Sequence, residues 1–439
     1  MSHESRSAPG AGVAAGSAGN AGTAGDRRTA GGPDHPRPSR GRRALRVTGL
    51  AVSGLLVVGL TAGAAVLPTL LPDRATDTVA APSVDLEPVE SALACTTGPT
   101  ATMGEAAVVD PAAAAADTTV YRTRLTATFP RTDPDAAPAA AATLDGDPLV
   151  PAGDLRLLGD DAPATATLTA EPVAAAGGDA MLSALASGST VSIAAAGDLR
   201  GLAAWPCAEA REVTWHVGGS TRVGASTQVT LTNIGATPAT AAIAVWGSLG
   251  PLEAPTAQNI TVAPGESEEV LLEGAVAPDP TVAVRVDVRG GALAVHAQDL
   301  ALDGLVPAGI AAVPAAAAPA TELTVPGVAP TPADPAVLRL VNPGETDADA
   351  TITAVGTDGT RVPQEPAVVP PQSVLAVPLT PTEGVWAVQV SADAPVAAAA
   401  ELRRTGQPSL LDPDTPPVDR AWAPAAGLRR TSTFALPRT

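Results

Sequence analysis

The chain has 439 residues and a formal net charge of −19, and it is 45% hydrophobic but only 2% aromatic, with 42 Gly, 45 Pro and no lysine. The acidic balance argues against nucleic-acid binding, because nucleic acids select basic surfaces. The length allows two or three domains of about 100–150 residues each in addition to shorter terminal segments.

Residues 1–46 are predicted to form a disordered, basic cytoplasmic tail, because they are rich in small residues and carry eight arginines against three acidic residues. Residues 47–71, VTGLAVSGLLVVGLTAGAAVLPTLL, contain no charged residue. This run exceeds the roughly 20 apolar residues that a membrane-spanning helix needs. Positive charge marks the cytoplasmic flank of a span. We therefore predict a single-pass protein of the cytoplasmic membrane, with its C-terminal domains outside.

Three other interpretations of this region compete. A cleavable signal peptide would end at the small residues Ala62-Gly63-Ala64, but the apolar run continues to Leu71, beyond the usual hydrophobic region of about 7–15 residues. A lipoprotein signal at Ala92-Leu93-Ala94-Cys95 lies well past the apolar run and lacks leucine at its first position. A buried helix of a soluble protein fits neither the length nor the basic flank. An uncleaved anchor is favoured.

The remaining chain, residues 72–439, holds 18 arginines and 42 acidic residues, a net charge of −24. Residues 72–94 are predicted to be a linker. Short β-branched stretches with Gly, Pro and Asp between them then predict strands, over residues 118–129, 164–170, 189–196, 226–233, 239–246, 258–263, 268–272, 281–288 and 292–297. A short helix is expected only over residues 178–186 (GDAMLSALA).

An internal repeat is the strongest signal in this part. Residues 231–247 align with residues 340–356, which places Asn233 opposite Asn342 at an offset of 109. Each copy has an Asn-x-Gly turn, in which glycine at 235 or 344 is expected to adopt a positive φ. A period near 110 fits sandwich domains of about 100 residues. We predict an all-β fold: a mostly-β membrane-proximal unit over 95–206, followed by tandem immunoglobulin-like sandwiches over 207–312 and 313–439.

The opening strand of the unit also recurs, with Trp205-Pro206-Cys207 matched by Val313-Pro314-Ala315 and by Ala423-Pro424-Ala425. Cys95 lies about one period before Cys207, so the two cysteines open successive units. Disulfides persist outside the cytoplasm, and we predict a bridge between Cys95 and Cys207 across the membrane-proximal unit. The alternative is that both are small buried hydrophobic residues.

With Val217-Gly218-Gly219-Ser220, Leu231-Thr232-Asn233, Val341-Asn342-Pro343-Gly344 and the Cys95/Cys207 pair, the chain resembles an actinobacterial family of anchored envelope proteins that is known only as a domain of unknown function. The resemblance covers roughly residues 90–439. It implies location and architecture, and it carries over neither an activity nor site residues.

No catalytic, cofactor-binding or metal-binding residues are predicted. Beyond the apolar run the sequence has only His216 and His296, each between apolar neighbours, which is typical of strand histidines. Nucleophile-elbow, zinc-protease and P-loop motifs are missing. The acidic pairs Asp145/Asp147, Asp160/Asp161 and Asp412/Asp414 offer oxygen ligands for calcium, but solvated turns are the simpler interpretation. Paired carboxylates for glycoside hydrolysis stay open, because such a pair is spatial. The five tryptophans are expected in the core.

Three functions remain in competition. The favoured hypothesis is a non-enzymatic envelope protein that binds or organises a cell-wall component or a protein partner. The second is an enzyme that processes envelope glycan or peptide at a site between units. The third is an accessory subunit of an export system. Fold alone does not choose among them.

Overall fold

The computed structural model describes residues 90–96, 98–99, 123–128, 142–149, 154–158, 165–174, 181–182, 186–194, 199–304, 306–380, 383–408 and 416–427. The chain divides into two compact units, Met1–Val84 and Asp85–Thr439, and every described residue belongs to the second. The predicted tail and the apolar run over 47–71 lie outside the described residues. None of the described helices has the length and apolar character needed to cross a bilayer.

The N-terminal part of the described chain, up to Glu209, forms two main sheets and a small strand pair. One sheet has the strand order β11-β1-β6-β3-β4 and the other β10-β9-β2-β5, while β7 pairs with β8. The strands are β1 (Ser91–Thr96), β2 (Thr123–Thr128), β3 (Ala142–Leu144), β4 (Asp147–Leu149), β5 (Asp154–Leu158), β6 (Thr165–Ala170), β7 (Val173–Ala174), β8 (Met181–Leu182), β9 (Ser187–Ala194), β10 (Gly201–Pro206) and β11 (Ala208–Glu209). We call this part the N-terminal unit.

The predicted disulfide closes the N-terminal unit, because Cys95 on β1 is bonded to Cys207 just after β10. Strand β1 begins at Ser91, inside the predicted linker, since its alternate residues Leu93 and Cys95 pack into the core of this unit. Strand β11 pairs with β1 although it lies beyond the predicted boundary at residue 206. Both ends of the unit therefore meet at the disulfide.

The next part, the first sandwich, consists of a sheet of order β15-β14-β18-β12-β21, with β16 paired to β14, and a sheet of order β17-β13-β19-β20. The elements are β12 (Val213–Val217), β13 (Ala225–Thr232), β14 (Ala239–Gly247), β15 (Gly250–Leu252), η1 (Pro255–Ala257), β16 (Ile260–Val262), β17 (Ser267–Leu271), α3 (Leu272–Ala275), β18 (Ala283–Arg289), β19 (Ala294–Asp303), β20 (Val306–Ala312) and β21 (Ala315–Ala316).

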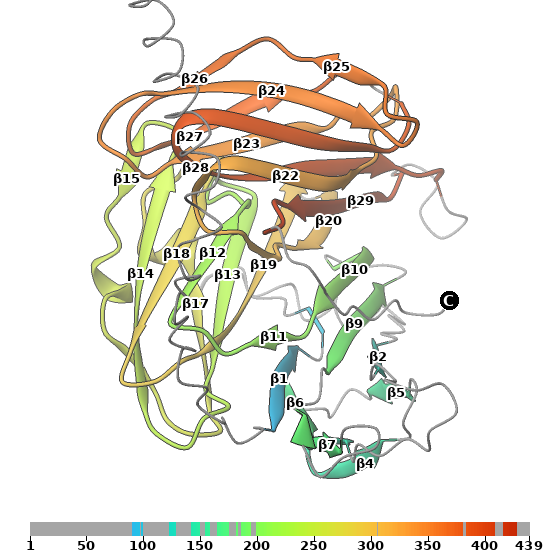
Figure 1. The fold of residues 1–439 in the computed structure, drawn as a ribbon, viewed down its shortest axis with the longest axis vertical. Helices are drawn as coiled ribbons and strands as arrows, with labels where there is room; N and C mark the ends of the chain where they lie inside the picture. The colour runs from blue at the N-terminus through green and yellow to red at the C-terminus, as the bar shows by residue number, and fades with distance from the viewer. Residues whose placement is uncertain are drawn as a thin grey trace, which may run out of the picture. The chain divides into compact units, whose positions relative to one another are not determined.

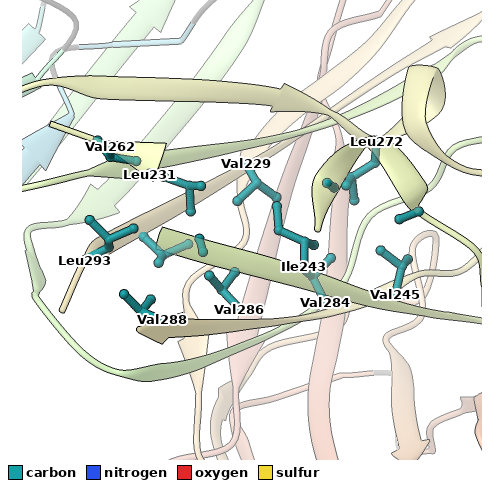
Figure 2. Close-up of a cluster of buried hydrophobic side chains, with 14 of the residues drawn as sticks. Val229, Leu231, Ile243, Val245, Val262, Leu272, Val284, Val286, Val288 and Leu293 are labelled. Carbon is teal, nitrogen blue, oxygen red and sulfur yellow. The ribbon is translucent and has the colours of Figure 1, made fainter. Parts of the chain in front are cut away.

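The core of the first sandwich lies between these two sheets (Figure 2). Strand β14 shows strict alternation of buried and half-buried residues, with Ile243 and Val245 pointing into this core. Val229 and Leu231 of β13 reach the same core from the opposite sheet. Small alanines share these strands with the larger aliphatic residues, which suits close packing of two sheets without aromatic residues.

The last part, the second sandwich, repeats this strand pairing. Its elements are β22 (Ala320–Val328), β23 (Val337–Asn342), β24 (Ala348–Gly356), β25 (Arg361–Pro363), β26 (Ala367–Val369), β27 (Ser373–Pro378), β28 (Trp386–Thr405) and β29 (Val418–Pro424). Strand β24 pairs with β25, β26 and β28, as β14 pairs with β15, β16 and β18. Strand β23 pairs with β27 and β28, as β13 pairs with β17 and β19.

One strand distinguishes the second copy. Strand β28 has 20 residues and takes the places of both β18 and β19 (Figure 1). Its first part, Trp386 to Ala392, pairs with β24, and its later part, from Ala397 to Glu401, pairs with β23. In the first copy the chain turns at Gly290, where φ is 80°, and two separate strands result.

The two predicted Asn-x-Gly turns have the same hydrogen bonds. Asn233 Nδ2 donates to the carbonyls of Thr237 (2.8 Å) and Val262 (2.9 Å), and its Oδ1 accepts from the Gly235 amide (2.9 Å). Asn342 makes the corresponding bonds in the second copy (2.7, 2.9 and 2.9 Å). The expected positive φ at the glycines is wrong, because neither is among the positive-φ residues. The asparagine side chain, acting as an Asx turn, closes the loop instead.

The predicted helix over residues 178–186 is also wrong where the structure describes it. Met181 and Leu182 form β8, which pairs with Val173 and Ala174. Alanine favours helices, but intrinsic propensity is a weak predictor that tertiary context overrides, and here strand pairing decides the structure. The third copy of the opening segment, Ala423-Pro424-Ala425, lies at the end of β29, where Ala423 and Pro424 pair with β28.

Candidate functional site at the junction of the units

The three parts of the described chain meet at their closing strands. Strands β10, β20 and β29, which lie near the C-terminal end of the N-terminal unit and of each sandwich, contact one another. Trp205 of β10 is 3% exposed and packs with Leu300 and Ile310 of the first sandwich in one apolar cluster. The amide of Leu202 on β10 donates a hydrogen bond to Oδ1 of Asp419 on β29 (3.1 Å). The C-terminal ends of the three parts therefore form one junction.

Trp422 of β29 anchors the second sandwich to the first. It is 5% exposed and belongs to an apolar cluster with Trp215 and Val217 of β12. Gly218 follows directly, with φ of 149°, and a Cβ at this position would lie 2.7 Å from the Trp422 ring. The glycine in the Val217-Gly218-Gly219-Ser220 segment thus provides room for a side chain of the next unit.

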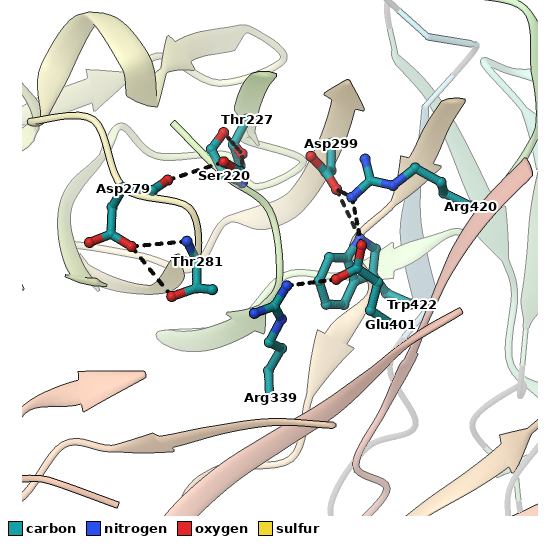
Figure 3. Close-up of polar contacts among 9 residues, drawn as sticks. All are labelled: Ser220, Thr227, Asp279, Thr281, Asp299, Arg339, Glu401, Arg420 and Trp422. Atoms are coloured by element: carbon teal, nitrogen blue, oxygen red, sulfur yellow. Dashed lines mark hydrogen bonds and ion pairs between the residues drawn. The ribbon is translucent and has the colours of Figure 1, made fainter. Parts of the chain in front are cut away.

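The loop that carries this glycine is held by polar contacts (Figure 3). Ser220 Oγ donates to the Asp279 carbonyl (3.1 Å), and Thr227 Oγ1 donates to the Ser220 carbonyl (2.9 Å). The Asp279 carboxylate accepts from the amides of Thr281 (2.9 Å) and Ser248 (3.0 Å). Through its carboxylate and its backbone carbonyl, Asp279 thereby links its own loop to the loops of Ser248 and Ser220 at one end of the sandwich.

A buried charge network crosses the junction (Figure 3). Arg420 of β29 lies 2.6 Å from Asp299 of β19 and 3.1 Å from Glu401 of β28. Glu401 also pairs with Arg339 of β23 at 2.7 Å. Trp422 Nε1 donates to Asp299 Oδ2 (3.2 Å). The network joins one strand of the first sandwich to three strands of the second.

Burial and ion pairing shift the pKa values of the residues in this network in opposite directions. Complete burial, reinforced by Glu401, raises the pKa of Asp299 against the attraction of Arg420. Burial works against the charged form of Glu401, but Arg420 and Arg339 outweigh it and lower the pKa of that carboxyl. Burial opposes the charge on Arg420 as well, and its two carboxylates raise its pKa. Removing Arg420 would leave Asp299 without its cation in an apolar setting.

A cavity of about 510 Å³ lies between the N-terminal unit and the first sandwich. Its walls come from β9, β10 and the Cys207 segment on one side and from β12 and β19 on the other. Trp205 and several prolines line it, together with Ser189, Thr214 and both predicted strand histidines, His216 and His296. Glu209 and Arg211 also line it and pair with each other at 3.1 Å, with exposed side chains.

Both histidines are neutral at pH 7. Burial lowers the pKa of His216 to about 4, although its hydrogen bond to the Val313 carbonyl favours the proton. Burial, with repulsion from His216, lowers the pKa of His296 to about 4 against the influence of the Pro206 and Ala94 carbonyls. His216 Nε2 and Ser189 Oγ have no hydrogen-bond partner among the described residues, and neither ring nitrogen of His296 makes a well-formed hydrogen bond, although the carbonyls of Pro206 and Ala94 lie close to the ring.

Other residues singled out in the sequence have structural roles. The Asp145-Gly146 turn joins β3 to β4 with positive φ at both positions, and Asp145 Oδ1 accepts from the Thr167 amide (2.7 Å). The acidic pairs 160/161 and 412/414 lie outside the described residues. Within the described part of the chain, no three His, Cys, Asp or Glu side chains are grouped to hold a metal ion. Three tryptophans are core residues, whereas Trp246 and Trp386 are half-buried.

The charge network was missed in the sequence. Asp299, Glu401 and Arg420 carry no motif, and they are far apart in the chain. The available signal was position: Glu401 lies between Ala400 and Leu402, and Asp299 is followed by Leu300-Ala301-Leu302, which is unusual for a carboxylate unless it is paired.

Comparisons with known proteins give one family and one solved structure. The sequence model of a family of unknown function, DUF5719, matches residues 159–439. No curated protein matches the chain. A solved structure from Thermotoga maritima, titled "Crystal Structure of Thermotoga maritima 1070", is similar at 16% identity over 24% of this chain and 93% of that chain, with a TM-score of 0.20. A TM-score of this size supports no conclusion about the fold.

Proposed function

The chain belongs to the family of unknown function DUF5719, and from that premise we propose that it is a non-enzymatic, single-pass protein of the cytoplasmic membrane that presents its β units outside the cell. In this role, it binds or organises a cell-wall component or an envelope protein. Residues 47–71 are the membrane anchor, and the two sandwiches are immunoglobulin-like modules that carry the binding surfaces.

The junction is the observation that carries this proposal. A scaffold for a polymer or a large partner has to keep separate surfaces in fixed positions. The packing of Trp205 and Trp422 on the first sandwich and the buried Arg420 network tie the three described parts together. Binding sites spread over several units gain from such preorganisation, because less freedom is lost on association.

Charge supports the same proposal. The arginines before the apolar run favour an N-terminus inside, and the net charge of −24 over residues 72–439 favours solubility and attraction to basic partners. Protease added to wall-stripped cells is expected to remove a C-terminal tag and to leave the N-terminal tail protected. A mature chain beginning near Ala65 would instead establish a cleaved signal peptide.

The partner is tested by crosslinking in intact cells and purification of the full-length, C-terminally tagged chain from membranes. We expect wild type and Arg404→Ala, which changes an exposed arginine of β28, to recover the same wall component or envelope protein. Arg420→Ala, which loosens the junction, is expected to recover less of it. Recovery no greater than that of the tagged segment 1–84 would refute a binding or organising role.

A further inference from the structure

The cavity between the N-terminal unit and the first sandwich has the composition of a small-molecule site. Its volume of about 510 Å³ lies within the range of about 300–1,000 Å³ that such sites occupy. Trp205, Pro206 and Pro314 give it apolar walls, and Ser189, His216 and His296 supply polar groups. Binding sites for small molecules typically combine a mostly apolar lining with a few placed polar groups.

The hydrogen-bonding requirement of His216 follows from its contacts. A carbonyl oxygen only accepts, so the 2.7 Å contact with Val313 fixes the proton on Nδ1 of His216. Nε2 of the neutral ring is then an acceptor that needs a donor. No described residue provides one, and the same holds for one nitrogen of His296. Buried polar groups in folded proteins are nearly always paired, so these atoms require hydrogen bonds from a molecule in the cavity.

The electrostatics select the charge of that molecule. The two histidines are uncharged, and the lining residues Glu209 and Arg211 neutralise each other at the exposed rim. A charged ligand would lose its hydration without finding an opposite charge, which is costly in an apolar setting. An uncharged molecule with several hydroxyl groups loses less and offers both donors and acceptors.

We propose that this cavity binds an uncharged, polyhydroxylated ligand such as a neutral sugar, with a ligand hydroxyl donating to His216 Nε2 and others bonding to Ser189 and His296. The apolar face of a sugar ring would pack on the lining prolines Pro206 and Pro314, which are exposed and half-buried. The site does not depend on the proposed anchor, because every residue that lines it lies between Leu93 and Pro424.

A transition metal is the alternative occupant, since neutral imidazole is a good ligand for zinc and copper. The described residues offer two imidazoles here without a third His, Cys, Asp or Glu in the group, and Cys207 is held in the disulfide. Metal binding at this cavity in place of sugar is therefore an outcome that contradicts the proposal.

The test uses the full-length protein in phosphatidylcholine nanodiscs, because maltoside detergents carry sugar head groups. Saturation-transfer NMR and calorimetric titration are performed with glucose, arabinose, trehalose and myo-inositol. Glucosamine, glucuronic acid and zinc serve as charged probes. We expect at least one neutral probe to bind, and the charged probes to bind about tenfold more weakly or not at all.

Variants locate the site. Ala204→Leu and Ala315→Leu add bulk at exposed positions that line the cavity and are expected to abolish binding without unfolding the chain. Ala376→Leu, at an exposed position of β27 that does not line the cavity, is the matched control and should bind as wild type does. His216→Leu is expected to weaken binding by about tenfold, the loss of one hydrogen bond.

Three results would overturn the proposal. The first is the absence of binding by every neutral probe at concentrations up to tens of millimolar, which leaves water as the occupant. The second is equal or tighter binding of a charged probe, zinc included. The third is neutral-sugar binding that survives in both Ala204→Leu and Ala315→Leu, which places the bound sugar elsewhere on the protein.

Discussion

Replacing Asn233 or Asn342 by alanine is expected to destabilise the protein by about 3 kcal/mol in each case. Each side chain makes three hydrogen bonds at 2.7–2.9 Å and is almost fully buried, with exposed fractions of 1% and 0%. Each bond contributes about 1 kcal/mol on a net basis, and the carbonyls left without a donor add to the loss. Because the two turns have matching contacts, the two losses should agree within about 1 kcal/mol.

Asn233→Asp distinguishes the two bonds that the side chain donates from the one bond that it accepts. Aspartate keeps the acceptor for the Gly235 amide, but it turns a carboxylate toward the carbonyls of Thr237 and Val262. We therefore expect a destabilisation at least as large as that of alanine. Thr237→Ala is the matched control, because Thr237 is exposed and contributes only its backbone carbonyl, and it should stay within about 0.5 kcal/mol of wild type.

Urea denaturation followed by tryptophan fluorescence measures these changes, and hydrogen exchange of peptides from residues 225–262 and 337–369 assigns each to its sandwich. Loss of protection is expected in the copy that carries the substitution. The reasoning is refuted if both alanine variants stay within about 0.5 kcal/mol of wild type. It is equally refuted if one is strongly destabilised while the other is unaffected, since the two turns would then not be equivalent.

Three further predictions concern the junction and the cavity. His216 and His296 have a pKa of about 4 in the folded protein and about 6.5 in the unfolded chain, so the unfolded chain binds their protons first as the pH falls. The free energy of unfolding should therefore fall by about 3 kcal/mol per histidine between about pH 6.5 and about pH 4. Urea titrations at several pH values should show that the free energy of unfolding depends less steeply on pH in His216→Asn than in wild type. Replacing Cys95 and Cys207 by serine removes a link across 112 residues and is expected to lower stability by up to about 4–5 kcal/mol, measured against wild type under non-reducing conditions. Arg420→Ala leaves a buried carboxylate unpaired and should cost about 3–5 kcal/mol in denaturation experiments, whereas simultaneous replacement of its partner on β19 by alanine should recover part of that loss.

Strand positions in the two sandwiches were predictable because alternation and turn residues are local signals. The expected strand over 239–246 corresponds to β14, Ala239–Gly247, and the aligned copy forms β24 with the same partners. The N-terminal unit was less accessible, as Met181 and Leu182 show: they form a strand of two residues paired with Val173 and Ala174, which is too short for alternation to be read from the sequence. The single long strand β28, which replaces two strands of the first sandwich, was not predicted either, because the second copy lacks the turn found at Gly290 in the first.

The junction could not be inferred from sequence, for a related reason. His216 and His296 are ordinary strand histidines until two sheets and the disulfide-linked segment place them on one cavity. Arg420 and Asp299 are separated by more than 100 residues and meet only after both sandwiches have formed. The Cys95–Cys207 disulfide was an exception, because the two cysteines are about one repeat apart in the sequence and could be paired from that spacing.

The unbroken strand β28 has a mechanical consequence. Its 20 residues correspond to a contour length of about 66 Å, and the same polypeptide segment is bonded into both sheets of the second sandwich. A pull along this strand loads the hydrogen bonds of both sheets in shear at once, since ladder bonds lie perpendicular to the strands. In the first sandwich, the turn at Gly290 lets β18 and β19 be peeled away one after the other. A pull along β28 would therefore meet more resistance than a pull along β18 or β19 alone.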